Sequence, residues 1–252
     1  MPQSETAAQL RFSAACQKAL SGKSGTGIGT LSEKTLHAAL KHYYAPWQEM
    51  QEIKIGSYIA DIVGEDGIVE IQTRAFDRLR KKLETFLSVT RVTVVHPIAR
   101  QKWICLTDPA TGEIVSRRKS PHRGSFYDVM PELYKIKYLL ANPGLTLVLA
   151  LIDVEEYRLL SDRPGVYRRT KARRHEQLPL ALAEEAVLQA AADYAIFLPE
   201  ELPELFDSAD LAKAARIRLS LAQTTLNILL ERGVVARQGK RGRRFLYRRT
   251  DK

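Results

Sequence analysis

The sequence has few cysteines, no long apolar run and no leader-like N-terminus, and each absence excludes a class of protein. Only Cys16 and Cys105 occur in 252 residues, both among aliphatic neighbours, which predicts reduced core thiols rather than a disulfide or a metal site. The longest apolar stretch, Leu145 to Ile152, is far shorter than the roughly 20 residues of a membrane span. Residues 1–10 lack the basic and apolar regions of a signal peptide. We therefore expect a cytoplasmic protein with no membrane partner.

Nucleotide-binding and zinc motifs are absent as well. Gly22-Lys23-Ser24 looks like the end of a Walker A loop, but position 17 is Gln where that loop requires Gly. The five histidines show none of the spacings that zinc ligands adopt. What the chain does have is a formal net charge of +10, and neutralisation of phosphates by Lys and Arg dominates non-specific binding to nucleic acids. The charge thus makes nucleic acid the first candidate partner.

The last fifty residues have the pattern of a winged helix-turn-helix module. Asp207-Ser208 predicts the start of a helix to about Ile217, and Ser220 the start of a second helix to about Arg232. Two short strands follow, Val234 to Arg237 and Arg244 to Arg248, joined by a Gly-rich basic loop. In such modules the second helix enters the major groove and the hairpin contacts phosphates. The DNA-binding residues predicted on this basis are Gln223, Thr224, Thr225, Asn227, Arg237, Lys240, Arg241, Arg243 and Arg244. The alternatives are a solvated basic hairpin or a winged helix that binds protein.

A hairpin in the N-terminal half carries acidic residues at alternating positions. Two strand-like runs, 57–63 and 68–73, flank a Gly-Glu-Asp-Gly turn. Whether the turn is Glu65-Asp66 or Asp66-Gly67, Asp61, Glu70 and Gln72 fall on one face, because strand side chains alternate. Two neighbouring carboxylates repel each other unless a cation or a proton lies between them, and their oxygens suit Mg²⁺ or Mn²⁺. The alternative is a solvent-facing sheet surface that carries acids with no special role.

A helix precedes this hairpin, and a helix and a strand follow it. Thr30 and Glu33 form a capping box at the start of a helix to about Tyr43, so Glu33 is either a cap or a metal ligand. An amphipathic helix over 76–87 has apolar residues on one side and Arg78, Lys81 and Lys82 on the other, and a β-branched strand covers 91–97. With a weakly alternating run over 49–54 counted as the first strand, the resulting order is one helix, three strands, a helix and a strand.

This order and these residues resemble the PD-(D/E)XK, or restriction-endonuclease-like, nuclease superfamily, mainly over residues 27–97. Glu33, Asp61 and Glu70-Ile71-Gln72 match its acidic positions, so the resemblance implies metal-ligand roles for Glu33, Asp61 and Glu70 and a carbonyl ligand from Ile71. Gln72 stands where the superfamily usually has a lysine that positions the attacking water and stabilises phosphate charge. Gln72 would orient the water instead, with the missing charge recruited from elsewhere. The candidates for that charge are Lys54, Lys81, Lys82 and Lys102.

Together these features predict an α/β protein with a restriction-endonuclease-like mixed sheet flanked by helices, followed by a small α+β winged-helix domain. The expected divisions are a nuclease-like domain at 1–160, a basic linker and connecting helix at 161–198, and the winged-helix domain at 199–252. The function that follows is a Mg²⁺- or Mn²⁺-dependent nuclease hydrolysing DNA phosphodiester bonds, with Asp61, Glu70 and Gln72 as catalytic residues. The alternative is a catalytically inactive nuclease-like DNA-binding protein or transcriptional regulator. The oligomeric state stays open, a homodimer included.

Overall fold

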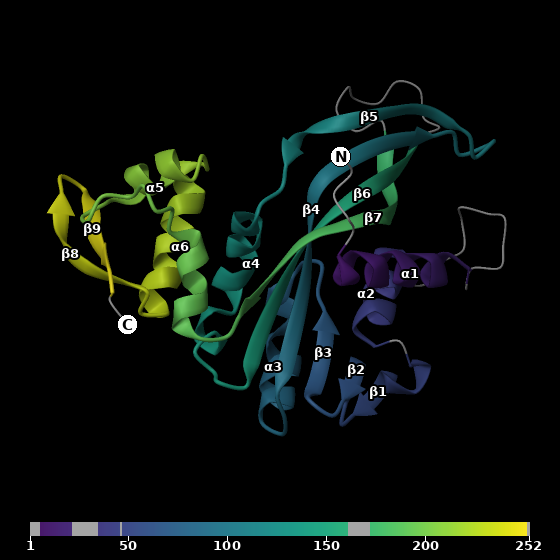
Figure 1. Ribbon diagram of the computed structural model, residues 1–252, viewed down its shortest axis with the longest axis horizontal. Helices are drawn as coiled ribbons and strands as arrows, with labels where there is room; N and C mark the ends of the chain where they lie inside the picture. The colour runs from purple at the N-terminus through teal and green to yellow at the C-terminus, as the bar shows by residue number, and fades with distance from the viewer. Residues whose placement is uncertain (1–5, 22–34, 46, 161–171, 251–252) are drawn as a thin grey trace. The chain divides into compact units, whose positions relative to one another are not determined.

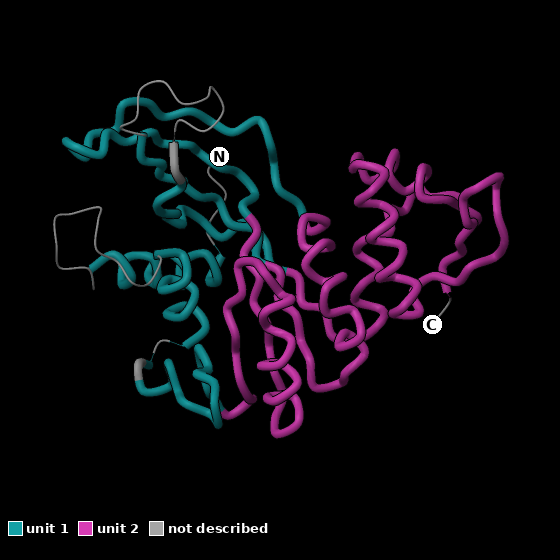
Figure 2. The backbone as a smooth tube through the Cα atoms, turned by 180° about the vertical axis from the view of Figure 1, so that it is seen from behind, with its two compact units in different colours: residues 1–64, 99–125, 150–185 teal, residues 65–98, 126–149, 186–252 magenta. Residues whose placement is uncertain are grey.

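The computed structural model describes residues 6–21, 35–45, 47–160 and 172–250 (Figure 1). It is a mixed α/β structure, in which a sheet with both parallel and antiparallel pairs is flanked by helices. Among the described strands, the hydrogen-bonded order is β1-β2-β3-β4-β6-β7, and β5 pairs with β4 off this path. The chain divides into two compact units, each made of three separate stretches of sequence (Figure 2). Each unit is described by itself below.

Unit 1 comprises residues 1–64, 99–125 and 150–185. Its own helices and strands are α1 (Ala7–Ser21), α2 (Thr35–Tyr44), η1 (Gln48–Met50), β1 (Gln51–Ile55), β2 (Tyr58–Gly64) and β5 (Ile114–Arg123). Helices α1 and α2 pack together around Phe12 and Tyr43, whose rings meet edge to face with centroids 5.5 Å apart. Strands β1 and β2 form an antiparallel pair. Both cysteines are buried and unbonded, which confirms the expected core thiols.

Three long strands contribute residues to both units. They are β4 (Val92–Thr107), β6 (Leu145–Leu160) and β7 (Ala172–Leu188). The strand predicted over 91–97 is part of β4, which continues to Thr107. Residues 172–188 are expected in a linker, whereas they form β7. Gln177, Leu182 and Leu188 of β7 are buried, while most of its other described residues are exposed or half-buried, so a strand rich in polar residues still covers part of the core.

Unit 2 comprises residues 65–98, 126–149 and 186–252. Its own elements are β3 (Gly67–Ile71), α3 (Phe76–Leu87), η2 (Phe126–Val129), α4 (Met130–Lys135), η3 (Lys137–Leu139), η4 (Ala191–Phe197), α5 (Ser208–Ala214), α6 (Leu219–Glu231), β8 (Val235–Arg241) and β9 (Arg244–Arg249). Strand β3 pairs with β4 in parallel, Ile68 with Val92 and Ile71 with Val95. A parallel pair requires a crossover, which is supplied here by α3. Its apolar stripe, Phe76, Leu79, Leu83 and Phe86, is buried as expected.

The C-terminal elements differ from expectation mainly at their ends. Helix α5 stops at Ala214, because Arg216 has a positive φ of 54° that no helix continues through. Helix α6 begins at Leu219 with Arg218 at its N-cap, so Ser220 lies inside the helix and does not cap it. Strands β8 and β9 pair from Val235 with Arg249 to Arg241 with Arg244, which leaves a two-residue turn at residues 242–243. The hairpin is therefore longer than its apolar residues indicate.

Helix content at the N-terminus and in the middle also departs from the sequence analysis. Helix α1 was not expected, because its buried face, made of Phe12, Ala15, Cys16 and Ala19, consists mostly of small residues and gives only a weak apolar stripe. The helix expected from Thr30 is described from Thr35 onward, and Glu33 lies outside the described residues. The single helix expected over 132–140 is divided into α4 and η3 at Ile136. Among the described residues, no helix is both long enough and apolar enough to cross a membrane.

Gly67 is the glycine whose lack of a side chain matters most at the β3–β4 pair. Its φ is +116°, and a Cβ atom placed there would lie 2.3 Å from the carbonyl oxygen of Arg91. That oxygen accepts the backbone hydrogen bond from Ile68 that starts the parallel pair. Any other residue would have to push β3 and the start of β4 apart.

We expect Gly67→Ala to lower the free energy of unfolding by at least about 1 kcal/mol more than Gly56→Ala does. Both glycines have positive φ, but a Cβ at Gly56 would meet nothing within 4 Å. The two substitutions therefore share a backbone penalty, and only Gly67→Ala adds the clash. Urea denaturation of the two variants measures the difference. Equal losses would show that the close approach at Arg91 is not a constraint.

Candidate active site and nucleic-acid interface

Glu70 is the most unusual residue of unit 2. It lies on β3 beside Val94 of β4, and only 2% of its surface is exposed. A carboxylate that leaves water at this depth needs a charged or hydrogen-bonding partner. Lys82 of α3 supplies one, with Nζ 2.5 Å from Glu70 Oε2. The crossover helix thus delivers a cation to the buried acid.

The sequence analysis misplaces Lys82 on the outer side of α3. Lys82 follows Leu79 by three residues and precedes Phe86 by four, so it borders the buried stripe. Its ammonium group also lies 5.6 Å from the centroid of the Phe86 ring. Lys81, one position away, is exposed. Helical periodicity could therefore have separated these two lysines, although it could not have identified Glu70 as the partner.

The other two candidate lysines lie in unit 1. Lys54 is exposed on β1. Lys102 forms an ion pair with Glu156 of β6, with 2.9 Å between Nζ and Oε2. Lys82, by contrast, is paired with the predicted site residue Glu70 of its own unit.

Gln72 follows β3 and is held by its backbone and its side chain. Its N–H donates to Val95 O at 2.9 Å, and its carbonyl oxygen lies 2.7 Å from His96 Nδ1. Its amide Nε2 donates to Arg74 O at 2.5 Å, in the loop that precedes α3. The side chain is thus turned toward its own loop. Ile71, the predicted carbonyl ligand, is buried within the same strand.

His96 stabilises this arrangement as a neutral ring. Burial lowers the pKa of His96, although the hydrogen bond to Gln72 opposes the shift. Because the Gln72 carbonyl can only accept, Nδ1 carries the proton that is donated to it. The ring of Phe76 packs edge to face against His96, with centroids 5.3 Å apart. His96 therefore connects the end of β3 with the start of α3.

Asp61 lies on β2 in unit 1. Its Oδ2 is 3.3 Å from Nε2 of His37, which projects from α2, and both side chains are about one-fifth exposed. The sequence analysis does not select His37, because no spacing along the chain marks a single histidine as a partner of a residue 24 positions later. The described neighbour of Asp61 on α2 is thus His37. Glu33, the acidic residue predicted to join Asp61, lies outside the described residues.

The donors at these positions fit a hard divalent cation in chemistry. Asp61 of unit 1 offers carboxylate oxygens, and in unit 2 Glu70 offers carboxylate oxygens and Ile71 a carbonyl oxygen, the ligand types that Mg²⁺ and Mn²⁺ prefer. Within residues 6–21, 35–45, 47–160 and 172–250, no three His, Cys, Asp or Glu side chains form a group that could hold a metal ion. The expected shared face of Asp61, Glu70 and Gln72 stays a prediction.

A second cluster of functional candidates surrounds α5, α6 and the β8–β9 hairpin. Gln223 is exposed and Thr224 half-buried near the start of α6. Thr225 is fully buried and its hydroxyl donates to Leu221 O, while the Asn227 side chain accepts from Lys137 Nζ at 3.3 Å. Thr225 and Asn227 thus face the protein interior of unit 2. Of the four predicted polar residues on α6, Gln223 and Thr224 are the ones left facing outward.

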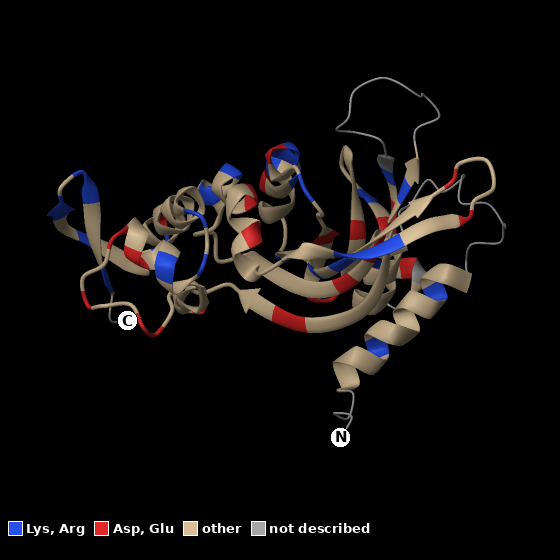
Figure 3. Cartoon of the chain, turned by 90° about the horizontal axis from the view of Figure 1, so that it is seen from above, with Lys and Arg blue, Asp and Glu red and all other residues tan. Residues whose placement is uncertain are grey.

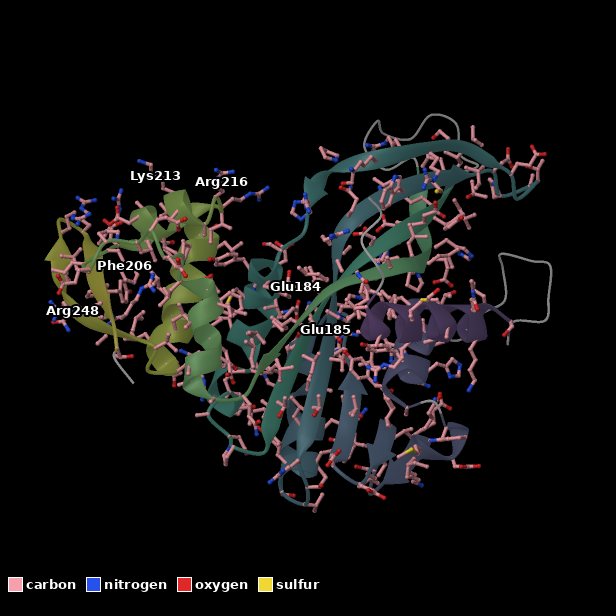
Figure 4. All side chains as sticks on the ribbon, viewed as in Figure 1. Glu184, Glu185, Phe206, Lys213, Arg216 and Arg248 are labelled. Carbon is pink, nitrogen blue, oxygen red and sulfur yellow. The ribbon has the colours of Figure 1, made fainter. Side chains whose placement is uncertain are left out.

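The turn between α5 and α6 adds cations that the sequence analysis omits. Lys213, Arg216 and Arg218 are exposed in this short segment. Figure 4 shows Lys213 and Arg216 extending away from the helices. Their spacing could have been noticed in the sequence, because three basic residues within six positions flank the break between two predicted helices.

The hairpin arginines fall into two groups. Arg241 and Arg244 reach back to the N-cap of α5, where Arg241 lies 3.0 Å from Asp210 and Arg244 3.4 Å from Asp207. Arg237 and Lys240 instead lie over the ring of Phe245, with 4.1 and 4.9 Å to its centroid. Exposed Arg243 occupies the turn. The first group therefore orients the hairpin on α5, and Arg237, Lys240 and Arg243 form its outer basic surface.

Asp207 is the acid on which that orientation depends. Burial raises its pKa, but hydrogen bonds from the N–H groups of Asp210 and Ala209 and from Arg244 outweigh burial, so the pKa is lowered. The Asp207 side chain caps α5, and the Asp210 side chain accepts a hydrogen bond from the Asp207 N–H. One ionised carboxylate thus serves both the helix and the hairpin.

Asp207→Ala should lower the free energy of unfolding by about 1 kcal/mol at neutral pH, as the loss of an N-cap does. Because the pKa is lowered on folding, the wild-type advantage is full above the ordinary Asp value of about 3.9 and is lost as the pH falls below it. Urea melts of both proteins at several pH values test this. Glu201→Ala, a nearby exposed acid, should show neither effect. A difference between Asp207→Ala and wild type that does not change with pH would contradict the assignment.

Comparison with known proteins gives two matches. Residues 34–189 match the family described as a domain of unknown function (DUF8091). An uncharacterized protein of Treponema pallidum (strain Nichols) is 34% identical over 224 residues, which cover 88% of this chain and 87% of the relative. No solved structure matches the chain significantly. The matched family region contains Asp61, Glu70, Gln72 and Lys82 and ends before α5.

Proposed function

The chain belongs to the DUF8091 family, and we propose that it is a metal-dependent nuclease that hydrolyses DNA phosphodiester bonds. The observation that carries the proposal is the buried pair of Glu70 and Lys82, an acid and a base at the end of a strand. Buried charged pairs are weak contributors to stability but are frequent in sites where charge is used. The pair lies in the element order that the restriction-endonuclease-like resemblance requires: α2, β1, β2, β3, α3 and β4.

Lys82 supplies the positive charge that the superfamily's usual lysine provides and that Gln72 lacks. Gln72 carries no charge, and its amide is bonded to Arg74 in the loop before α3. The ammonium group of Lys82 can stabilise negative charge on a phosphate that approaches Glu70, as preorganised cations do in phosphoryl transfer. In this proposal Glu70 and Lys82 work together, while Gln72 and His96 fix the backbone that carries Glu70.

Asp61, Glu70 and the main chain of Ile71 would hold Mg²⁺ or Mn²⁺, which when bound supplies an activated water and charge stabilisation at the phosphate. His37 contributes by holding the Asp61 carboxylate through its Nε2 atom. Glu33 remains a further ligand candidate from the sequence. Gln72 would hydrogen-bond the water through its carboxamide.

The C-terminal residues 199–252 act in this proposal as a winged helix-turn-helix domain that docks duplex DNA. Support comes from the two helices, the hairpin and the exposed cations at both. Gln223 and Thr224 at the start of α6 would reach base edges, while Lys213, Arg216, Arg218 and the outer hairpin cations Arg237, Lys240 and Arg243 would contact phosphates. Arg241 and Arg244 would contribute in one of two ways. They would either leave their aspartate partners and bind phosphates, or hold the hairpin in its orientation on α5.

One observation favours a second candidate, an inactive nuclease-like DNA-binding protein or transcriptional regulator. Lys82 neutralises Glu70 directly, so a metal ion would have to compete with this ion pair. A protein that had lost cleavage could keep the pair for stability alone. The cleavage experiment below separates the two candidates.

Purified protein with Mg²⁺ or Mn²⁺ should nick plasmid DNA or cut branched DNA, and chelation should abolish the cutting. Asp61→Ala should remove cleavage, and Lys82→Met should lower its rate roughly 100-fold, since a positioned charge at the phosphate is lost. Lys81→Met, an exposed neighbour on α3, is the matched control and should retain full activity.

Stability controls keep this result interpretable. Glu70→Gln leaves Lys82 without its charge partner, so the double variant Glu70→Gln with Lys82→Met is compared with it by thermal melting. Absence of metal-dependent cleavage on every DNA tested would favour the inactive candidate. Full activity in Asp61→Ala would contradict the site.

Lys213→Ala with Arg216→Ala should weaken binding to duplex DNA and make the slope of log affinity against log salt less steep by about 1.8, which is 0.9 for each lost phosphate contact. Fluorescence anisotropy over a salt series measures the slope. Arg248→Ala is the control, because Arg248 of β9 is bonded to Glu204 at 2.7 Å. An unchanged slope in the double variant would mean that this turn does not contact phosphates.

A further inference from the structure

The β4–β5 hairpin of unit 1 carries a cationic surface around an aromatic ring. Strand β5 contains four Lys or Arg residues and no acid, and nearly all of its residues are exposed. Figure 3 shows the basic residues of β5 as a blue stretch on this strand. The register pairs Trp103 with Lys119 and Cys105 with Arg117, so these side chains share one face of the hairpin. We call Trp103, Arg117 and Lys119 the β5 strip.

Both cations of the strip lie against the indole ring. The Arg117 guanidinium is 5.5 Å and the Lys119 ammonium 5.8 Å from the centroid of the Trp103 ring, within the range of cation–π contact. Arg117 also pairs with Glu155 of β6 at 2.7 Å, and Glu155 accepts a second bond from the Tyr157 hydroxyl at 2.9 Å. The acid near the strip is thus already bound by two groups, and Trp103 itself is half-buried.

We propose that the β5 strip binds an unpaired nucleic-acid strand, with Arg117 and Lys119 meeting phosphates and a base stacking on Trp103. Basic residues that interleave with an aromatic ring are the combination used by surfaces for single strands. Charge alone would have a simpler explanation, since charged side chains keep an exposed edge strand from pairing with another chain. That protection needs no aromatic ring and no preference for one face of the strand.

The inference deepens the proposed function and rests on it for its biological meaning. A duplex held by α5, α6 and the hairpin, together with an unpaired strand on the β5 strip, would make the substrate a DNA end or junction rather than a plain duplex. The test measures binding without divalent metal. A failure of the cleavage proposal can therefore be distinguished from a failure of single-strand binding by the β5 strip.

The full chain with Trp47→Phe leaves Trp103 as the single tryptophan, because the sequence has two. Titration with oligothymidylate should quench the Trp103 emission saturably, and added salt should reverse the quenching. Lys119→Ala in this background should weaken the affinity at least fivefold. Arg118→Ala removes the same charge from the neighbouring position, which the register pairs with Ile104 on the opposite face, and should weaken it less than twofold.

A second pair of variants tests the stacking without relying on tryptophan emission. With a labelled oligothymidylate and anisotropy, Trp103→Ala should weaken binding fivefold or more, while Trp103→Phe should recover most of it. Equal effects of Lys119→Ala and Arg118→Ala would show diffuse attraction and overturn the proposal. So would the absence of quenching, or equal quenching by a duplex of the same length.

Discussion

The burial of Glu70 is the constraint on which much of unit 2 depends. A carboxylate that is 2% exposed needs a cation, and α3 provides one only if it crosses back over the sheet with Lys82 turned inward. That crossover also makes β3 and β4 parallel neighbours. The close approach at Gly67 and the bond from His96 to Gln72 fix the two ends of β3 around the acid. Fold and candidate chemistry thus share the same few contacts.

The C-terminal part of unit 2 follows a similar principle, in which one set of charges builds the structure and another faces outward. Lys137 of η3 bonds Asn227 and lies 3.7 Å from Glu231, so the inner side of α6 is attached to the rest of the unit. Asp207 and Asp210 hold Arg241 and Arg244. Outward charges at Lys213, Arg216, Arg218 and Arg243 face away from these contacts. A DNA duplex bound there would be held by a module that packs on its own unit through α4 and η3.

Much of the local structure could be predicted from the sequence, and the errors have identifiable causes. The stripe of α3, the hairpin at Gly64 to Gly67 and the C-terminal helix-helix-hairpin order all follow from periodicity and turn residues. Strand β4 is longer than predicted and β7 occupies residues expected in a linker, because cross-strand pairing tolerates polar and proline residues that local propensity excludes. Helix α1 was not predicted because its apolar stripe is weak. Its buried residues become visible only through its packing against α2.

The sequence by itself determined which residues carry charge, the buried stripe of α3, the helix-helix-hairpin order at the C-terminus, and that Asp61 and Glu70 lie on neighbouring strand segments. Only the tertiary structure decided which partner each charge has. It joined Glu70 to Lys82, Asp61 to His37 and Trp103 to Arg117 and Lys119, and it turned Thr225 and Asn227 inward. The reason is physical: backbone propensity is local along the chain, whereas burial and ion pairing act through space between residues that the chain does not place next to each other.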